Sequence, residues 1–374
     1  MSFYTTPLQF GYFFGLLFAI LLWVRGRQEE RLSDTLLGWV LFFLVFEIQD
    51  YTFGFAGINV LWEELNGFPR SLQLLFGPAV WFYLKSQINR RFQLQRADLL
   101  HLIPWLLCFT FNIAIFGQGK YFVQQWQTSI FHQVAEALET LSILLSYGFY
   151  FSGSLSLYRQ YRQWAESHFS DTEVVSLKWY RNFLYLMVFS IVFKWIWFGI
   201  DRLLTLDFYQ DWWWNLATAG ILVYVAITGY RQRQWSQMTF EAPVPIPEPE
   251  RPSNPEFEFA ALKEKLLEMM ALEKPYLEPE LTLADLARKL KISPSLLSQV
   301  INTAFEKNFN DFINAYRVAD FKNCMGRAEF RHLTLLGIAM ACGFNSKATF
   351  NRAFKKQTGQ SPSQYWANLK HPDA

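Results

Sequence analysis

The sequence predicts an all-α protein, with a seven-helix transmembrane bundle followed by a cytoplasmic domain of two tandem helix-turn-helix units. Two observations predict this fold class. Apolar runs separated by short polar loops fill the chain up to about residue 235, and closely spaced charged residues replace them afterwards. A repeat of helix, tight turn and helix then occupies roughly the last hundred residues. We therefore expect the two parts of the chain to lie in different solvents.

Seven apolar runs have the length of membrane-spanning helices. Each is near the roughly 20 residues that cross a hydrocarbon core, and stretches such as "FGYFFGLLFAILLWV" are apolar on every side, as lipid requires. Basic residues follow the first run instead of preceding it, so a cleaved signal peptide explains that run poorly. The predicted spans are residues 8–24, 36–56, 70–88, 99–117, 137–157, 183–204 and 212–230.

The charges of the connecting loops predict an orientation in the membrane. Loops after the first, third, fifth and seventh spans hold the basic stretches "RGRQEER", "NRRFQLQR", "YRQYRQW" and "RQRQ", whereas the alternate loops are nearly free of Lys and Arg. By the positive-inside rule, the N-terminus lies outside and the chain beyond Arg231 lies in the cytoplasm. The transmembrane domain is thus predicted over residues 1–235.

A proline-rich linker, residues 236–256, is predicted between the two parts. Its stretch "EAPVPIPEPERPSNPE" cannot continue a helix and, as an extended spacer at ~3.1 Å per residue, reaches about 50 Å. The next segment, 257–275, is predicted to be a helix that adjoins the C-terminal domain. Its apolar residues recur at three- and four-residue spacing: Phe259, Leu262, Leu266 and Met269. This stripe either packs on its own domain or forms a short dimer seam.

The last segment, 276–374, contains the internal repeat. "TLADLARKLKISPSLLSQVI" aligns with "TLLGIAMACGFNSKATFNRAF" when one extra residue is allowed in the second turn. The aligned pairs are Leu286 with Ile338, Ala287 with Ala339, Ile292 with Phe344 and Leu297 with Phe350. Ser293 before Pro294 is typical of a helix start, and Gly343 can end the helix that precedes it. Helix-turn-helix units are predicted at about 281–305 and 334–358.

Four stretches carry a resemblance to a known family: "LTLADLARKL", "SPSLLSQVIN", "FNDFINAYR" and "GIAMACGFNSKATFNRAFKKQTGQSPSQYW". They resemble the DNA-binding domain of the AraC/XylS family of transcription regulators, over about a quarter of the chain. Two positions depart from the family pattern. Glu306 stands where a glycine usually closes the second helix of the first unit, and Phe321 stands where an alanine usually follows the linker-helix arginine, here Arg317.

The resemblance implies a bacterial transcription regulator that binds double-stranded DNA. The membrane half is similar to the multi-span sensor modules that precede this domain in some bacterial regulators, which implies a multi-pass protein of the bacterial cytoplasmic (inner) membrane. No glycine loop for phosphate, paired metal ligands or nucleophile beside a base is found in the sequence, so we expect no enzyme activity, no metal and no cofactor. The cysteines Cys108, Cys324 and Cys342 predict neither a disulfide framework nor a metal site.

The second helix of each unit is expected to enter the major groove with its first turns facing base edges. The candidate base-reading residues are Ser295, Ser298 and Gln299 in the first unit and Lys347, Thr349 and Arg352 in the second. Arg352 and Gln299 have the geometry for bidentate contacts to guanine and adenine, each worth about 1–3 kcal/mol of discrimination. Candidate phosphate contacts, which fix register without reading sequence, are Asn302, Lys355 and Lys356.

Charged residues within the predicted spans are candidates for sensing. Glu47 lies near the middle of the second span and Lys194 near the middle of the sixth. An unpaired charge there costs at least about 2.5–3.5 kcal/mol, so each needs a partner or a wet cavity. We hypothesise that Glu47, with Asp50 one turn away, faces Lys194 and forms a ligand pocket or a switchable ion pair. A purely structural ion pair is the alternative.

The sequence as a whole predicts a one-component, membrane-bound transcription regulator. Its expected partners are double-stranded DNA, the membrane, and a small molecule or membrane signal that the sequence does not identify. A homodimer is compatible with the sequence but is not required by it. The alternative functions are a membrane transporter, or an inert membrane anchor, fused to a DNA-binding domain.

Overall fold

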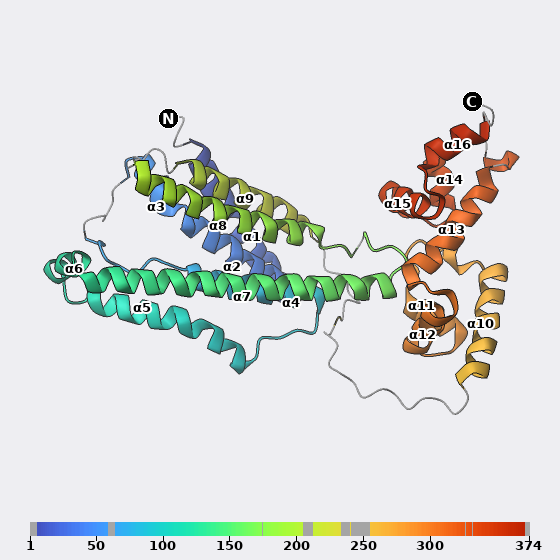
Figure 1. Cartoon of the computed structure of the whole chain (residues 1–374), viewed down its shortest axis with the longest axis horizontal. Coiled ribbons are helices and arrows are strands. Elements are labelled where there is room, and N and C mark those ends of the chain that lie inside the picture. The colour runs from blue at the N-terminus through green and yellow to red at the C-terminus, as the bar shows by residue number, and fades with distance from the viewer. Residues whose placement is uncertain are drawn as a thin grey trace. The chain divides into compact units, whose positions relative to one another are not determined.

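The computed structural model describes an all-helical chain (Figure 1), in which the described residues form one isolated antiparallel bridge, between Phe169 and Thr282, and no strand. The described residues are 6–58, 64–173, 175–204, 212–232, 240, 255–325, 327–330 and 332–370. The predicted linker, 236–256, falls almost wholly outside them. Two compact units form: residues 1–158 with 177–241, and residues 159–176 with 242–374. Residues 159–176 thus belong to the second unit, although the sequence analysis assigned them to the transmembrane domain.

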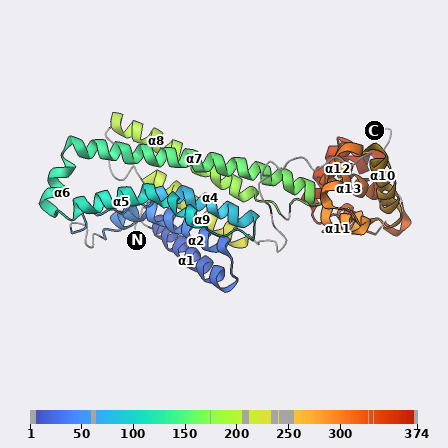
Figure 2. The same cartoon turned by 90° about the horizontal axis from the view of Figure 1, so that it is seen from below.

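The first unit has a helix at each position where a span was predicted. The helices are α1 (Thr6–Gln28), α2 (Leu32–Glu47), α3 (Gln49–Phe55), α4 (Gln73–Ile88), η1 (Arg96–Leu102), α5 (Ile103–Phe116), α6 (Lys120–Gln127), α7 (Ile130–His168), α8 (Lys178–Leu204) and α9 (Trp212–Arg231). The short α6 joins α5 to α7 at one end of the unit (Figure 2). α7 is a single helix of 39 residues, and its last residues, from 159 on, are part of the second unit.

Only two of the described helices are long and apolar enough to cross a membrane: α1, and the continuous stretch Arg96–Phe116. α2 and α3 make a third if their 43° bend lies within one span. The count by length and composition is therefore two or three, not the seven predicted. One reason is length, because α2 and α4 have 16 residues each and span about 24 Å, less than a hydrocarbon core of about 30 Å. Another is composition, since Ser, Gly, Tyr and Trp alternate with the apolar residues of α7 and α9.

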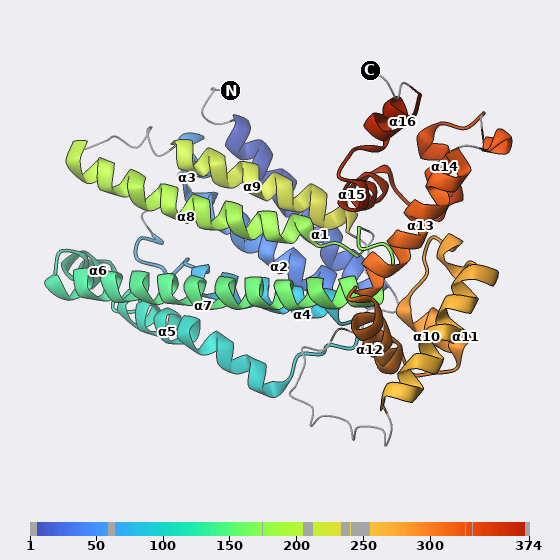
Figure 3. The same ribbon diagram turned by 45° about the vertical axis from the view of Figure 1, so that its right-hand side comes forward.

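The second unit is organised around α13 (Phe309–Met325). Figure 3 shows α13 between two groups of helices. One group is α10 (Pro255–Leu272), η2 (Pro275–Leu277), α11 (Leu283–Leu290) and α12 (Pro294–Phe305); the other is η3 (Ala328–Phe330), α14 (Leu335–Ala341), α15 (Lys347–Thr358) and α16 (Pro362–Lys370). Each group packs its own hydrophobic core against α13.

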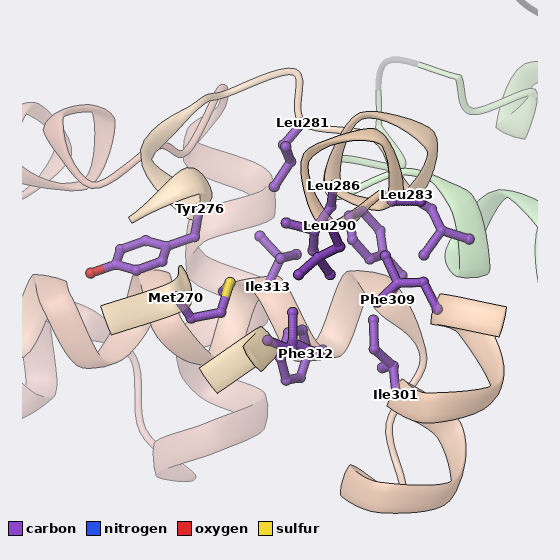
Figure 4. Close-up of a cluster of buried hydrophobic side chains, with 13 residues drawn as sticks. Met270, Tyr276, Leu281, Leu283, Leu286, Leu290, Ile301, Phe309, Phe312 and Ile313 are labelled. Carbon is purple, nitrogen blue, oxygen red and sulfur yellow. The ribbon is translucent and has the colours of Figure 1, made fainter. Parts of the chain in front are cut away.

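The first of these cores joins α10, α11, α12 and α13. In Figure 4 the side chains of Leu286, Leu290 and Ile313 meet at its centre. Leu266 and Met270 bring α10 into the same cluster and are 0% and 1% exposed. The apolar stripe of α10 therefore packs within its own unit, as in the first of the two interpretations of that stripe.

The second core joins α13, α14 and α15 and is rich in phenylalanine. Phe321 is fully buried, with its ring centroid 4.6 Å from that of Phe350 and 5.5 Å from that of Phe354. The phenylalanine at a position where the family usually has alanine thus fills the space between α13 and α15. The aligned positions of the repeat occupy equivalent places, because Leu286 and Leu297 lie in the first core where Ile338 and Phe350 lie in the second.

Candidate nucleic-acid interface

The helix α15 is held by a cap at each end and by two buried rings. The Ser346 side chain accepts a hydrogen bond from the backbone N–H of Thr349 at 3.1 Å, which fixes the first turn. Gly359 ends the helix in the left-handed region, with φ 74°. Phe350 and Phe354 turn one face into the core, so the opposite face is presented outward. Exposed cations on that helix are Lys347, Arg352, Lys355 and Lys356.

The helix α12 is built in the same way but presents a neutral surface. Ser293 caps it by accepting from the backbone N–H of Leu296 at 3.2 Å, and Pro294 occupies its first position, both as predicted. The helix ends at Glu306, whose φ of 53° is left-handed, which explains why a glycine suits this position. Its candidate DNA contacts lie on the outer side: Ser295, Gln299 and Asn302 are exposed and Ser298 is half-buried. Of these two helices, only α15 therefore presents cations.

Two residues of α15 that were predicted to contact DNA bind other groups of the protein in this structure. Thr349, predicted to read bases, is 1% exposed, and its hydroxyl donates to Asp171 Oδ1 at 2.9 Å. Lys356, predicted to contact phosphate, forms an ion pair of 2.7 Å with Asp311 of α13. Thr349 is thus buried against Asp171 and is not available on the outer face of α15. Lys347 and Lys355 remain exposed.

Arg352 also has protein partners. Its Nη1 donates to Glu173 Oε1 at 2.8 Å, and its Nη2 donates to Thr172 Oγ1 at 3.3 Å. These partners come from the segment that directly follows α7. Sequence reasoning missed this contact, because nothing in the acidic stretch "SDTE" indicates which cation it faces.

The backbone of the segment after α7 is hydrogen-bonded to the loop before α11 and to α13. Ser170 donates its N–H to the carbonyl of Leu281 at 3.2 Å, beside the bridge between Phe169 and Thr282. Asn310 of α13 donates to the Ser170 carbonyl at 2.7 Å. These hydrogen bonds position Asp171, Thr172 and Glu173 next to α15.

Arg317 of α13 ties this segment to the turn before α11. Its side chain is fully buried and donates to the carbonyls of Tyr276 at 2.7 Å and Glu278 at 2.8 Å, and to Ser170 Oγ at 3.1 Å. Burial lowers the pKa of Arg317 to about 10, and the nearby Asp171 carboxylate partly opposes that shift. The guanidinium therefore stays protonated at neutral pH and keeps its donors.

The structure brings together two of the three candidate sensing residues in the first unit. Lys194 Nζ lies 3.1 Å from Glu47 Oε1, and Gln73 donates to the other carboxylate oxygen at 2.7 Å. The ammonium also lies 4.4 Å from the ring centroid of Trp214. Asp50 pairs instead with Arg70 at 3.1 Å. An open apolar cavity of about 450 Å³ is lined by Phe189, Phe193, Trp197, Trp213 and Ala217, so neither Glu47 nor Lys194 lines it.

The sequence predicted no metal site at the cysteines, yet the fold brings two of them beside a carboxylate. The potential ligand atoms of Asp320, Cys324 and Cys342 lie within 4.8 Å of one another, and the two sulfurs are 4.0 Å apart. Structural zinc almost always takes four ligands, and this cluster offers three. Burial raises the pKa of the Cys342 thiol, with a further contribution from Cys324, which favours neutral thiols that pack as small apolar groups.

Comparison with known proteins places the similarity in the C-terminal part of the chain. Residues 286–368 match a family model described as a helix-turn-helix domain. The chain is 24% identical over 100 residues to the HTH-type transcriptional regulator CdhR of Pseudomonas aeruginosa, covering 27% of this chain and 29% of that protein. It is 33% identical over 85 residues to the uncharacterized HTH-type transcriptional regulator YijO of Escherichia coli, covering 23% and 29%. It is 28% identical over 88 residues to the uncharacterized HTH-type transcriptional regulator YtdP of Bacillus subtilis, covering 24% and 11%.

The match thus spans less than a third of each of these relatives. No solved structure matches the chain.

Proposed function

We propose that this protein is a membrane-bound transcription regulator that binds specific double-stranded DNA through α12 and α15. The observation that carries the proposal is the repeated geometry of the second unit. Two helix-turn-helix units share α13, each holds its second helix by a serine cap and a buried apolar face, and the similarity to transcriptional regulators covers the same residues. Groove reading is the use for which a tandem arrangement of this kind is suited.

The two second helices have different chemistry for DNA. Arg352 has the planar fork that suits guanine O6 and N7, and Gln299 has the amide that suits adenine N6 and N7. Lys355 lies one turn beyond Arg352 and is placed for phosphate, where it adds affinity that depends on salt. Helices that enter successive major grooves on one face of DNA are about 34 Å apart. One protomer then reads two half-sites, and a homodimer is not required.

The outer surface of the first unit supports a membrane location. Large apolar side chains are exposed along α1, α5, α7 and α8, and so much exposed apolar surface is rare on soluble monomers. Examples are Phe10, Phe13 and Leu17 on α1, Leu107 and Phe111 on α5, Leu138 and Phe149 on α7, and Val188, Phe189 and Ile196 on α8. Helices α2 and α4 are short, but most of their residues are buried within the unit, so they need not face lipid along their full length.

On this proposal the first unit lies in a bacterial cytoplasmic membrane, with the N-terminus outside and the second unit in the cytoplasm. The basic loops predicted on the inner side support that orientation. The apolar cavity of α8 and α9 faces the same medium as these exposed side chains. A lipid or another apolar molecule is therefore the class of signal that fits this cavity. The transporter and anchor alternatives predict that no such signal changes DNA binding.

The proposal is tested by selecting sequences from a random duplex pool with the full chain in lipid nanodiscs. We expect enrichment of a motif with two half-sites about 10 base pairs apart, one helical turn. We also expect the half-site read by α15 to contain guanine, because Arg352 is the side chain on that helix that has a bidentate fork. Recovery of an unenriched pool at moderate ionic strength would refute sequence-specific DNA binding.

The Glu47–Lys194 pair gives a separate prediction about the first unit. Glu47→Gln leaves the ammonium of Lys194 without its counter-charge, and an unpaired charge at the membrane centre costs about 2.5–3.5 kcal/mol. We expect this variant to lower the thermal midpoint of the chain in nanodiscs, and Glu47→Gln with Lys194→Gln to restore most of it. If the double variant also keeps signal-dependent DNA binding, the pair is structural and the sensing role is excluded.

A further inference from the structure

We propose that residues 169–173 form an intramolecular cover over the DNA-reading face of α15, and that this acidic segment competes with DNA for Arg352. We call these residues, "FSDTE", the cover segment. The inference rests on the proposed function, since it describes how the same surface is regulated. DNA then binds through α15 only after the cover segment has moved away from it.

The cover segment holds both terminal nitrogens of Arg352. One terminal nitrogen donates to Glu173 at 2.8 Å and the other to Thr172 at 3.3 Å. A bidentate contact to guanine needs two parallel N–H donors of the same guanidinium. Both terminal nitrogens are held by the cover segment, so this segment and a base edge compete for the same end of the guanidinium.

A carboxylate of the cover segment lies at the N-terminal turn of α15. Asp171 is 5% exposed and accepts from the hydroxyl of Thr349, the third residue of that helix. Negative charge is favoured at this end of a helix, by the free N–H groups and the helix dipole. Asp171 and Glu173 therefore present to α15 the kind of charge that a DNA backbone would present.

The cover segment is anchored by buried hydrogen bonds, most of them to α13. Ser170 is fully buried; its N–H donates to Leu281, its carbonyl accepts from Asn310 at 2.7 Å, and its hydroxyl accepts from Arg317 at 3.1 Å. Asn314 lies next to Asn310 on α13 and is 3% exposed. A chance surface contact would not bury three polar side chains of α13 against one backbone turn.

The cover segment is connected to the first unit through α7. It directly follows α7, whose residues 130–158 belong to the first unit and whose last turns belong to the second. The two units are thus joined by α7 as well as by the proline-rich linker. A change in the first unit that displaces the end of α7 would withdraw the cover segment, which gives a signal a covalent route to the DNA-reading face.

The contacts at Arg352 are weak enough to be reversed. The side chains of Arg352 and Glu173 are 45% and 25% exposed, and ion pairs at such sites change an equilibrium by about two- to fivefold. Loss of this pair should therefore shift the population toward the open form without unfolding the unit. Charge reversal at Glu173 should shift it further, because two like charges would then face each other.

The test compares affinities of the full chain in lipid nanodiscs for a fluorescent duplex carrying the motif selected from the random pool. We expect Glu173→Gln to bind about two- to fivefold more tightly than the wild type. The matched control is Glu166→Lys, which makes the same change of charge as Glu173→Lys but removes an exposed pair with Arg162 within α7. We expect Glu173→Lys to exceed this control by about fivefold or more.

A second measurement does not depend on the substitutions. Amide hydrogen exchange of the wild-type chain should become faster at residues 169–173 when the duplex binds, while exchange in the first turns of α15 becomes slower. Slower exchange in both places, or equal affinities for Glu173→Lys and Glu166→Lys, would overturn the cover segment while leaving DNA binding intact. Failure of every variant to bind any duplex would instead overturn the proposed function, and the inference with it.

Discussion

Arg317→Leu is expected to lower the free energy of unfolding of the second unit by about 3 kcal/mol. The side chain is fully buried and satisfies the carbonyls of Tyr276 and Glu278 together with the hydroxyl of Ser170. Leucine would leave these acceptors in a dry environment, where each unpaired polar group costs about 1–3 kcal/mol. The desolvation recovered by removing a buried charge offsets part of this loss. The measurement is urea unfolding of the full chain, followed by amide hydrogen exchange of α13.

The matched control for Arg317→Leu is Lys289→Leu, at an exposed cation on α11. Exposed substitutions of this kind stay within about 0.5 kcal/mol. Because Arg317 also holds Ser170, the Arg317 variant should loosen the cover segment along with α13. A variant with wild-type stability and a wild-type exchange rate at residue 170 would show that this buried arginine does not anchor the cover segment.

Arg352→Ala is expected to remove the preference for guanine in one half-site. A bidentate contact is worth about 1–3 kcal/mol, so the ratio of affinities for the selected duplex and for a duplex with that base changed should fall roughly 5- to 150-fold. The substitution also removes the contacts to Thr172 and Glu173, which opens the cover segment. The comparison is therefore made in a Glu173→Gln background, where that part of the effect is already present.

Lys355→Ala is the control for the Arg352 experiment, because it removes a charge one turn away on the same helix. A phosphate contact should weaken binding equally for all sequences and reduce the salt slope by about 1. Affinity is measured by titration of labelled duplexes at several salt concentrations. Unchanged base preference in Arg352→Ala, or loss of preference in Lys355→Ala, would assign base reading to other residues.

Local signals were sufficient to predict how the second unit folds. Ser293 with Pro294 starts α12 as expected, and Gly343 has a φ of 90°, in a place where a Cβ would lie 2.4 Å from the Tyr276 carbonyl oxygen. The repeat also predicted the buried faces, since its aligned positions form two equivalent cores. Caps, turns and apolar spacing are encoded within a few residues, so one sequence reveals them.

The contacts between distant segments were not predictable from such signals. Thr349 was expected to face bases, but it is buried against Asp171, which is 178 residues earlier in the chain. Lys356 was expected to meet phosphate, but it pairs with Asp311. Charge complementarity has no fixed spacing in sequence, so nothing in "SDTE" indicated which cation it would face. The pairing of Glu47 with Lys194 was hypothesised only because two charges at one membrane depth have few other partners.

The number of spans shows how a composition rule can miscount. Apolar runs were counted by their length and by the lack of a polar face, although α2 and α4 have only 16 residues and α7 and α9 mix Ser, Gly, Tyr or Trp with their apolar residues. Inner helices of a bundle can contact other helices more than lipid. The thickness of the bilayer then does not fix the length of each helix separately.

The central claim is that one chain is embedded in a membrane and also reads DNA sequence. The most direct test is to map DNA crosslinked to the full-length chain recovered from the membrane fraction of its native cells, beside the Arg352→Ala variant. The account predicts discrete sites with two half-sites one helical turn apart, which the variant loses. The claim would be contradicted if the membrane-bound chain gave no discrete sites. It would also be contradicted if the same sites were bound by chain recovered only from the soluble fraction.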